Sequence, residues 1–542
     1  MKQWNSPWKV LSFINLGLAL ALICGIPSMS EGEMPKKGGT LIYAMEAEPD
    51  ILDPHVAGGW HTNRLTLQIH DCLVGYDLTT PVEQQPIPKL VGVLAETWDV
   101  SPDGKVYTFH LRKGVKFHDG TPFNADAVRI NVERVWFKDS KWFWGRGPGR
   151  NSRHFAYLSE LKVVDDHTIQ FVMSQPFSEF LQQMANVTAN GQCIISPTQL
   201  KKLGNENYHT HPVGTGPFEF VERVHGDRVV LKRFEGYWGD KAHVDRLIIR
   251  PMPEATARVT ALQTGEADII VIPPPDSREQ LVKQGFKWVQ ASRTHHVWYL
   301  IFNMQNEHFK KKLVRQAVSY AIDRKSMAKY LLKDTAEPGI YGLLPPVNTA
   351  YDANMRAYEY NTEKAKELLA QAGYPNGFQT ILHISVDGSG QMIPVPMMEY
   401  IQSDLKKVGI DAKIEAFEWV TYLGIWSKGM KPEVGIMQLS WGQPNPNWLS
   451  IVLHSRWSAP KGSNAGHYQN PALDRVMDAA VQETDPGKAR LLWQEANRMA
   501  TEDAALAAVV HDRISLAMSP KVKGFVHPGL EWWTFRTVWL DQ

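Results

Sequence analysis

Apolar residues recur every three or four positions in several segments, the spacing that places side chains on one face of an α-helix. We expect helices over residues 125–135, 362–372, 398–408 and 486–499. Asn124 and Asp485 stand at N-cap positions, and Pro486 suits a first helical turn. Gly373 and Gly409 are expected to end the second and third helices.

Runs typical of β-strands lie between these helices. They are rich in β-branched and aromatic residues and cover residues 106–111, 168–173, 229–234, 246–252, 297–302 and 414–419. Helices and strands alternate along the whole chain, and no repeat of fixed period is visible. The pattern therefore predicts layers of mixed α/β structure.

The first thirty residues have a different pattern. Lys2 and Lys9 precede an apolar, uncharged stretch over residues 10–30, which ends with the small residues Ser28 and Ser30. This order predicts a secretory signal peptide over residues 1–30, with an uncleaved membrane anchor as the alternative. No later stretch reaches the ~20 apolar residues of a membrane span. We expect an exported, soluble mature protein in the periplasm.

Composition narrows the function classes. The chain has 542 residues, which at ~150 residues per domain suggests three to four domains. Its formal net charge is only +1 and it shows no basic stripe, so we expect no binding to nucleic acid. The 19 Trp, 17 Tyr and 20 Phe can fill a core or supply stacking walls for a ligand.

Cysteine and histidine give little evidence for a cofactor. Removing the signal peptide leaves Cys72 and Cys193, which can form one disulfide, although the sequence does not show whether they are adjacent. The pairs His209/His211 and His295/His296 can in principle hold a metal, but 19 histidines produce such pairs by chance. We therefore expect no metal site and no cofactor.

Enzyme motifs are poorly represented. Gly214-Thr215-Gly216 is followed by Pro217 and so does not match a phosphate-binding loop. The sequence contains no His-Glu-x-x-His, Gly-x-Ser-x-Gly or Cys-x-x-Cys motif. We expect a protein that is not an enzyme, with a secreted hydrolase as a remote alternative.

One long motif points to a family. LAETWDVSPDGKVYTFHLRKGVKFHDGTPFNADAV, residues 94–128, resembles the signature region of the extracytoplasmic solute-binding proteins that serve oligopeptide, dipeptide and nickel ABC importers, solute-binding protein family 5. Further matches follow in the family's order, at residues 213–220, 234–240, 315–327, 360–378 and 407–419. The resemblance extends from about Gly38 to the C-terminal end.

The resemblance implies an α/β fold, the type II periplasmic binding protein fold with two lobes, and an extra domain inserted in the first lobe. The first lobe would comprise residues 36–78, 205–293 and 512–542, the extra domain residues 79–204, and the second lobe residues 294–511. It also implies a monomeric periplasmic receptor that captures short peptides between the lobes. The receptor would deliver them to an inner-membrane ABC permease and its ATPases.

The resemblance also implies several ligand contacts. Trp441 and Trp419 correspond to tryptophans at the family's cleft, and Glu48 to a cleft-facing acidic position. Arg153, followed by His154, resembles an Arg-His pair near the cleft of the nickel-chelate binder and would suit a ligand carboxylate. The alternatives are core indoles for the tryptophans, a surface carboxylate for Glu48, and a solvated loop for Arg153.

One departure from the family pattern concerns the cargo. Peptide-binding members carry an aspartate a few residues after the tryptophan equivalent to Trp441, where it pairs with the ligand's α-ammonium. Residues 441–448 contain no acid here, and Asn445 offers only neutral hydrogen bonds or builds a turn. Because burying an ammonium without a carboxylate is costly, the departure favours the alternative cargoes, namely an opine, a sugar derivative or a metal chelate.

Overall fold

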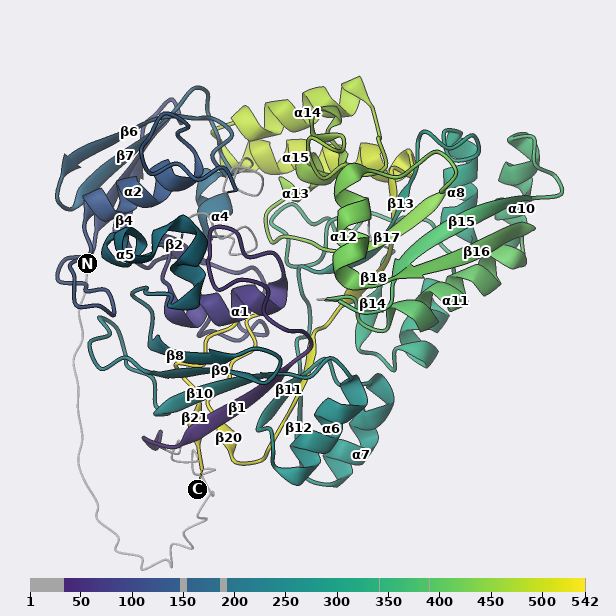
Figure 1. Ribbon diagram of the computed structural model, residues 1–542. Coiled ribbons are helices and arrows are strands. Elements are labelled where there is room, and N and C mark those ends of the chain that lie inside the picture. Colours follow the sequence, from purple (N-terminus) through teal and green to yellow (C-terminus); the bar gives the residue numbers. More distant parts are fainter. Residues whose placement is uncertain (1–33, 147–153, 186–192, 341, 389, 542) are drawn as a thin grey trace, which may run out of the picture. The chain divides into compact units, whose positions relative to one another are not determined.

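A seven-stranded sheet draws its strands from both ends and the middle of the chain (Figure 1). The computed structural model describes residues 34–146, 154–185, 193–340, 342–388 and 390–541, and residues 36–542 form one unit. In this sheet β1 runs parallel to β10 and β11, and the other pairs are antiparallel. The strands, in sheet order, are β12 (Lys287–Gln290), β19 (Ser515–Met518), β11 (Ile269–Val271), β1 (Thr40–Met45), β10 (Arg246–Pro251), β9 (Arg228–Arg233) and β8 (Phe218–Val224).

A six-stranded sheet is formed by later segments of the chain. Strand β15 runs parallel to β16 and β17, whereas β13 runs antiparallel to its neighbours β17 and β18. Helix α11 packs on β15 and β16. The strands, in sheet order, are β14 (Ala336–Pro338), β18 (Leu506–Asp512), β13 (Val297–Phe302), β17 (Ile436–Ser440), β15 (Phe378–Ser385) and β16 (Ile410–Phe417).

A smaller antiparallel sheet of four strands carries helix α2 against β6. Its strands, in sheet order, are β4 (Ala95–Val100), β5 (Val106–Leu111), β7 (Thr168–Met173) and β6 (Leu158–Asp165). Two short ribbons complete the strands: β2 (Val74–Tyr76) with β3 (Leu90–Gly92), and β20 (Val522–Lys523) with β21 (Trp539–Leu540).

The helices of the described residues are mostly short. They are α1 (Trp60–Ile69), α2 (Ala125–Val135), α4 (Phe180–Ala185), α5 (Pro197–Asn207), η2 (Tyr208–Thr210), α6 (Ala255–Thr264), η3 (Pro275–Ser277), α7 (Arg278–Lys283), α8 (Lys312–Ala321), α9 (Arg324–Ser326), η4 (Met327–Leu331), α10 (Thr362–Gln371), α11 (Pro394–Lys406), α12 (Trp419–Lys428), α13 (Trp448–Leu453), η5 (Ser455–Trp457), α14 (Pro471–Gln482) and α15 (Pro486–Glu502). In the part of the chain that the structure describes, none is long and apolar enough to cross a membrane.

Local sequence signals explain where several elements begin. The Asn124 side chain accepts a hydrogen bond from the Ala127 N–H at 3.0 Å and starts α2, and Asp485 caps α15 in the same way. The predicted strands at residues 106–111, 168–173 and 297–302 are confirmed at both ends. Strand β13 is buried along its whole length because its alternating side chains pack into two different hydrophobic clusters, one on each face of the sheet.

One predicted strand has the wrong boundary. We expected a strand over residues 414–419, but β16 spans Ile410–Phe417 and Trp419 is the first residue of α12. The Glu418 carboxylate accepts hydrogen bonds from the N–H groups of Val420 and Thr421, which fixes a helix start directly after the strand. The aromatic pair Phe417 and Trp419 therefore belongs to a strand–helix junction.

A disulfide joins Cys72 to Cys193, which answers a question that the sequence left open. Both cysteines are buried, and their backbones form an isolated antiparallel bridge. The bond closes a loop of 121 residues that contains the whole four-stranded sheet. The disulfide therefore holds Cys193, at the far end of this loop, next to Cys72 in the segment that follows α1.

The disulfide yields a first prediction. Mature protein denatured without reductant should show no free thiol, and reduction should expose two. Replacing both cysteines with alanine should lower the free energy of unfolding by about 2–5 kcal/mol, because the long loop is then open in the unfolded chain. Thiol titration and denaturant melts of wild type and variant measure both effects. Two reactive thiols in the unreduced wild type would contradict the pairing.

Candidate functional site

Two short segments connect the large sheets. Residues 291–296 lead from β12 in the seven-stranded sheet to β13 in the six-stranded sheet, and residues 513–514 lead back from β18 to β19. The segments run side by side, since the Ala291 N–H donates to the Arg513 carbonyl at 3.1 Å. Residues next to this double connection contact both sheets.

Four rings form an aromatic cluster at the first connection. Trp60, the first residue of α1, stacks on Trp532 with ring centroids 5.5 Å apart and an interplanar angle of 11°. His295 lies tilted against both indoles, and His296 meets Trp60 edge-on at 6.0 Å. All four side chains are buried. We call this set the Trp60 cluster.

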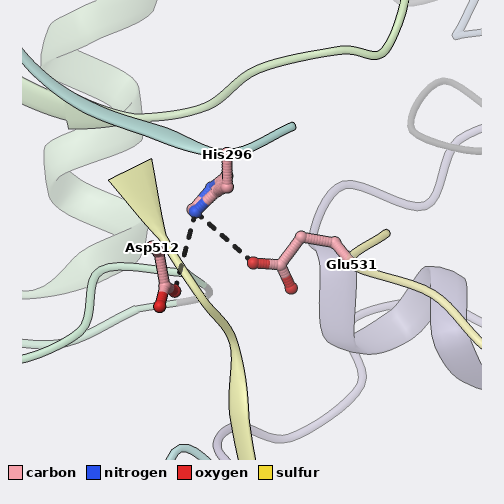
Figure 2. Close-up of side chains that lie close together, drawn as sticks. All are labelled: His296, Asp512 and Glu531. Carbon is pink, nitrogen blue, oxygen red and sulfur yellow. Dashed lines mark ion pairs between the residues drawn. The ribbon is translucent and has the colours of Figure 1, made fainter. Parts of the chain in front are cut away.

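A buried ion network adjoins the Trp60 cluster. The Arg64 guanidinium donates to both oxygens of Glu46, at 2.8 and 3.0 Å, and to Glu531 Oε2. The other oxygen of Glu531 lies 3.4 Å from His296 Nδ1, and Asp512 Oδ2 lies 3.8 Å from the same nitrogen (Figure 2). The five side chains come from the residue after β1 (Glu46), from α1, from the first connection, from the end of β18 (Asp512) and from the C-terminal segment.

The members of this network have pKa values that are shifted in different directions. Burial would raise the pKa of Glu46, but the Arg64 charge lowers it below the usual range. Burial raises the pKa of Glu531 above its usual range despite the nearby cations. Burial alone would lower the pKa of His296, but Glu531 and Asp512 raise it. A neighbouring ring behaves differently, because burial and the adjacent His296 hold the pKa of His295 well below its ordinary value.

Trp441 lies at this connection. It follows β17, its N–H donates to the Val297 carbonyl at 2.9 Å, and its ring meets Trp426 edge-on at 6.3 Å. The next residue is a glycine because the chains pass so closely: a Cβ on Gly442 would lie 1.9 Å from the His295 carbonyl oxygen. Trp441 is 9% exposed.

Asn445 lies where three segments meet. Its side-chain oxygen accepts from Gln183 Nε2 and its amide donates to Gln443, each at 3.2 Å, and its side chain is within hydrogen-bonding reach of the Tyr76 hydroxyl. Tyr76 lines two cavities, of about 280 and 420 Å³, and Trp532 also lines the second. Asn445 therefore contacts Gln183 of α4 on one side and Tyr76 on the other, and Tyr76 lines a cavity together with Trp532 of the Trp60 cluster.

Glu179 is a buried acid next to Asn445 that the sequence analysis missed. It precedes α4, is 6% exposed, and has no hydrogen-bond partner for Oε2. Burial raises its pKa to about 7, and the Trp493 indole offsets part of the rise. Its charge in turn raises the pKa of Tyr76, so the two groups are close. A single acid in an apolar run gives no sequence motif by which to find it.

The remaining predicted contacts lie elsewhere. Trp419 packs against the backbone of Gly388, where a Cβ would lie 2.4 Å from the indole, and both Trp419 and Trp441 belong to the largest hydrophobic cluster. Glu48 pairs with Arg223 at 2.6 Å and His225 at 3.1 Å, at the hairpin of β8 and β9. Arg153 lies outside the described residues. The acid that enters the buried network is Glu46, two positions before Glu48.

Comparison with known proteins identifies the class. The model of the middle part of bacterial extracellular solute-binding proteins, family 5, matches residues 89–460. The dipeptide-binding protein of Escherichia coli K12 is 29% identical over 541 residues, covering 96% of each chain. This chain belongs to the extracellular solute-binding proteins of family 5, which confirms the resemblance.

Solved structures confirm the fold class, a mixed α/β fold that matches two-lobed periplasmic binding proteins. The periplasmic binding protein DppA of Helicobacter pylori, in complex with the peptide STSA, superposes with a TM-score of 0.82 at 29% identity, covering 94% of this chain and 99% of that one. AgaA from A. tumefaciens R10, in complex with agropinic acid, gives a TM-score of 0.78 at 26% identity, covering 93% and 99%.

Buried histidines yield a second prediction, on pH. Burial lowers the pKa of five histidines to about 3 or 4: His55, His70, His118, His511 and His527. Since their unfolded pKa is about 6.5, the unfolded chain binds more protons, and stability is complete above pH 6.5 and lost as the pH falls toward 4. Asp71 and Glu179, whose pKa values are raised to about 6 and 7, act in the opposite direction but are fewer.

We expect the free energy of unfolding to fall by roughly 1.4 kcal/mol per pH unit for each net proton taken up, which for three net protons is on the order of 6 kcal/mol between pH 6.5 and 5. Denaturant midpoints across this range measure it. Equal stability at pH 7 and pH 5 would contradict neutral buried histidines.

Proposed function

We propose that this protein captures short peptides at the connection between its two large sheets and delivers them to an inner-membrane ABC permease and its ATPases. In this proposal the mature protein is a periplasmic monomer, released after removal of residues 1–30. The lobes would have the boundaries expected from the sequence: residues 36–78, 205–293 and 512–542, residues 79–204, and residues 294–511. The peptide bound to DppA and the name of the E. coli relative support this cargo.

One observation carries the proposal. Where α4, the 441–448 segment and α15 meet, buried polar atoms lack hydrogen-bond partners, including Glu179 Oε2, Gln183 Oε1 and Gln443 Nε2. Folded proteins rarely leave such atoms unpaired, because each costs about 1–3 kcal/mol. A peptide backbone alternates N–H donors and C=O acceptors, so it can pair with the unpaired acceptors and with the unpaired donor. Asn445 and Trp441 are the contacts proposed around it, and Trp419, Glu48 and Arg153 stay proposed contacts from the family pattern.

Glu179 supplies the charge that the 441–448 segment lacks. A ligand ammonium needs a carboxylate when it is taken out of water, and no acid follows Trp441 in that segment. Glu179 approaches the segment from the other side through Gln183, which lies one turn later and bonds Asn445. A cation next to Glu179 would stabilise its ionised form and remove the cost of its burial.

A non-peptide solute is the second candidate. The stack of Trp60 on Trp532 with His295 against both gives flat apolar walls, which suit ring compounds without demanding one pattern of hydrogen bonds. The agropinic acid bound to AgaA supports this candidate.

Thermal melts against a library of di- to pentapeptides separate the two cargoes, and this is the third prediction. At a hundredfold excess over Kd, a ligand that binds only the folded protein stabilises it by about 2.7 kcal/mol. At least one peptide should therefore raise the melting temperature clearly. Opines and glycosides in a parallel plate are the comparison. A shift with these compounds and with no peptide would transfer the assignment to the non-peptide solute.

The fourth prediction concerns Glu179. With the best peptide, Glu179→Gln should weaken binding at least thirtyfold, since losing the partner of a buried charge costs about 2 kcal/mol or more. Because the pKa of Glu179 is about 7, wild-type affinity should rise between pH 6 and pH 8, and the variant should lose this dependence. Calorimetric titration at the two pH values measures both effects.

Two comparisons make this experiment specific. The Nα-acetylated peptide has no ammonium, so it should bind wild type and Glu179→Gln with similar affinity. Glu48→Gln is the matched variant at the acid that the family pattern indicates, and because Glu48 already pairs with Arg223 and His225, it should weaken binding less than Glu179→Gln does. A loss in Glu48→Gln with none in Glu179→Gln would return the role to the family position.

A further inference from the structure

Three potential metal ligands converge at the connection between the sheets. His296 Nδ1, an oxygen of Asp512 and an oxygen of Glu531 lie within 4.8 Å of one another, and all three side chains are buried. Figure 2 shows both carboxylates pointing toward the same nitrogen of the imidazole ring. Their positions in the sequence are far apart, and of the pair His295/His296 considered from the sequence only His296 belongs to this group.

Each carboxylate uses one oxygen for a protein donor and turns the other toward His296. Asp512 Oδ1 accepts from the Ile514 N–H at 2.8 Å, and Glu531 Oε2 accepts from Arg64. The second oxygen of Glu531, Oε1, has no hydrogen-bond partner although the side chain is fully buried. Donors outside the group thus fix the carboxylates, as commonly seen for metal ligands.

The spacing fits a metal ion better than hydrogen bonds. His296 Nδ1 lies 3.4 Å from Glu531 Oε1 and 3.8 Å from Asp512 Oδ2, beyond the ~2.9 Å of a good N–H···O bond. Ligands at about 2.0–2.2 Å from a tetrahedral ion are separated by about 3.3–3.6 Å. Small side-chain movements would bring the three atoms to that geometry.

The charges also favour a cation. Glu46, Asp512 and Glu531 carry three negative charges when ionised, and Arg64, which bonds two of them, supplies one positive charge. A divalent ion would balance the remainder with His296 neutral, the form in which histidine binds metals. Buried charges are costly unless balanced, so the group gains more from a cation than a surface cluster would.

The surroundings pack closely on the histidine. Ser440 Oγ lies 3.3 Å from His296 Nδ1 and 3.4 Å from Nε2, so one hydroxyl is shared between the two ring nitrogens. Gly390 covers the group with φ +71°, and a Cβ there would lie 2.5 Å from His296 Cε1. Only glycine allows this segment to approach so closely.

We propose that His296, Asp512 and Glu531 form a binding site for one divalent transition-metal ion of the zinc class at the connection between the two sheets. One nitrogen and two carboxylate oxygens are typical ligands for Zn²⁺, and three protein ligands leave a fourth position for water or a donor atom of a solute. The inference does not depend on the cargo, and it replaces the sequence expectation of no metal site.

Zinc titration of the tag-free, chelator-treated mature protein tests the site. Calorimetry should show one equivalent of Zn²⁺, and Co²⁺ should give the intense visible absorption of a four- or five-coordinate ion. Mg²⁺ and Ca²⁺, which prefer oxygen ligands in larger number, should compete poorly. Wild-type protein that binds no zinc, or a cobalt spectrum of a six-coordinate aquo ion, would overturn the proposal.

Variants locate the ion. His296→Gln, Asp512→Asn and Glu531→Gln should each weaken zinc binding at least tenfold. His110→Gln is the matched control, because exposed His110 pairs with Asp99 at 2.8 Å and offers a histidine–carboxylate pair away from the site. Undiminished binding in all three variants, or the same loss in the control, would contradict the site. If a variant does not fold, the wild-type stoichiometry and cobalt spectrum decide the question alone.

Discussion

The buried guanidinium of Arg64 holds the two ends of the chain together. It bonds Glu46 after β1 and both the side chain and the carbonyl of Glu531 near the C-terminus. Removing one partner of such a buried pair costs about 3–5 kcal/mol, because the remaining charge is left uncompensated. This requirement fixes the C-terminal segment on α1, and with it the stack of Trp532 on Trp60. The second connection, which ends at β19, is held in the same region.

Local signals in the sequence predicted the elements that depend on neighbours in the chain. Helix α2 begins after the N-cap Asn124, and β5, β7 and β13 have the expected bounds, because capping and alternation act within a few residues. The strand expected over residues 414–419 had the wrong end for the same reason: apolar residues alternate with glutamates up to Trp419, but the Glu418 carboxylate caps a helix there. The capping Glu418 was the signal for the helix start, and the strand-like pattern around it made this signal easy to miss.

The site was less predictable, since its groups meet only through tertiary packing. Glu46 and Glu48 differ by two positions and are equally acidic in the sequence, yet one enters the buried network and the other pairs with Arg223. On a strand end, a shift of one or two residues decides which element a side chain meets. The role proposed for Glu179, as the partner of a ligand ammonium, depends on α4 and α15 lying close together, which the sequence could not predict. The family motif located Trp441, because that motif is local.

The buried acids Glu179 and Glu531 each have a carboxylate oxygen without a hydrogen-bond partner. Unpaired oxygens on Glu179 and Glu531, and a histidine between two carboxylates, raise the free energy of the folded chain without its partner. Groups that bind only the folded form offset this cost. An ion at His296 would lie beside the Trp60 cluster, so its charge would act on any solute seated there. The two sites would then be coupled through His296, and the sign of the coupling would follow the charge of the solute.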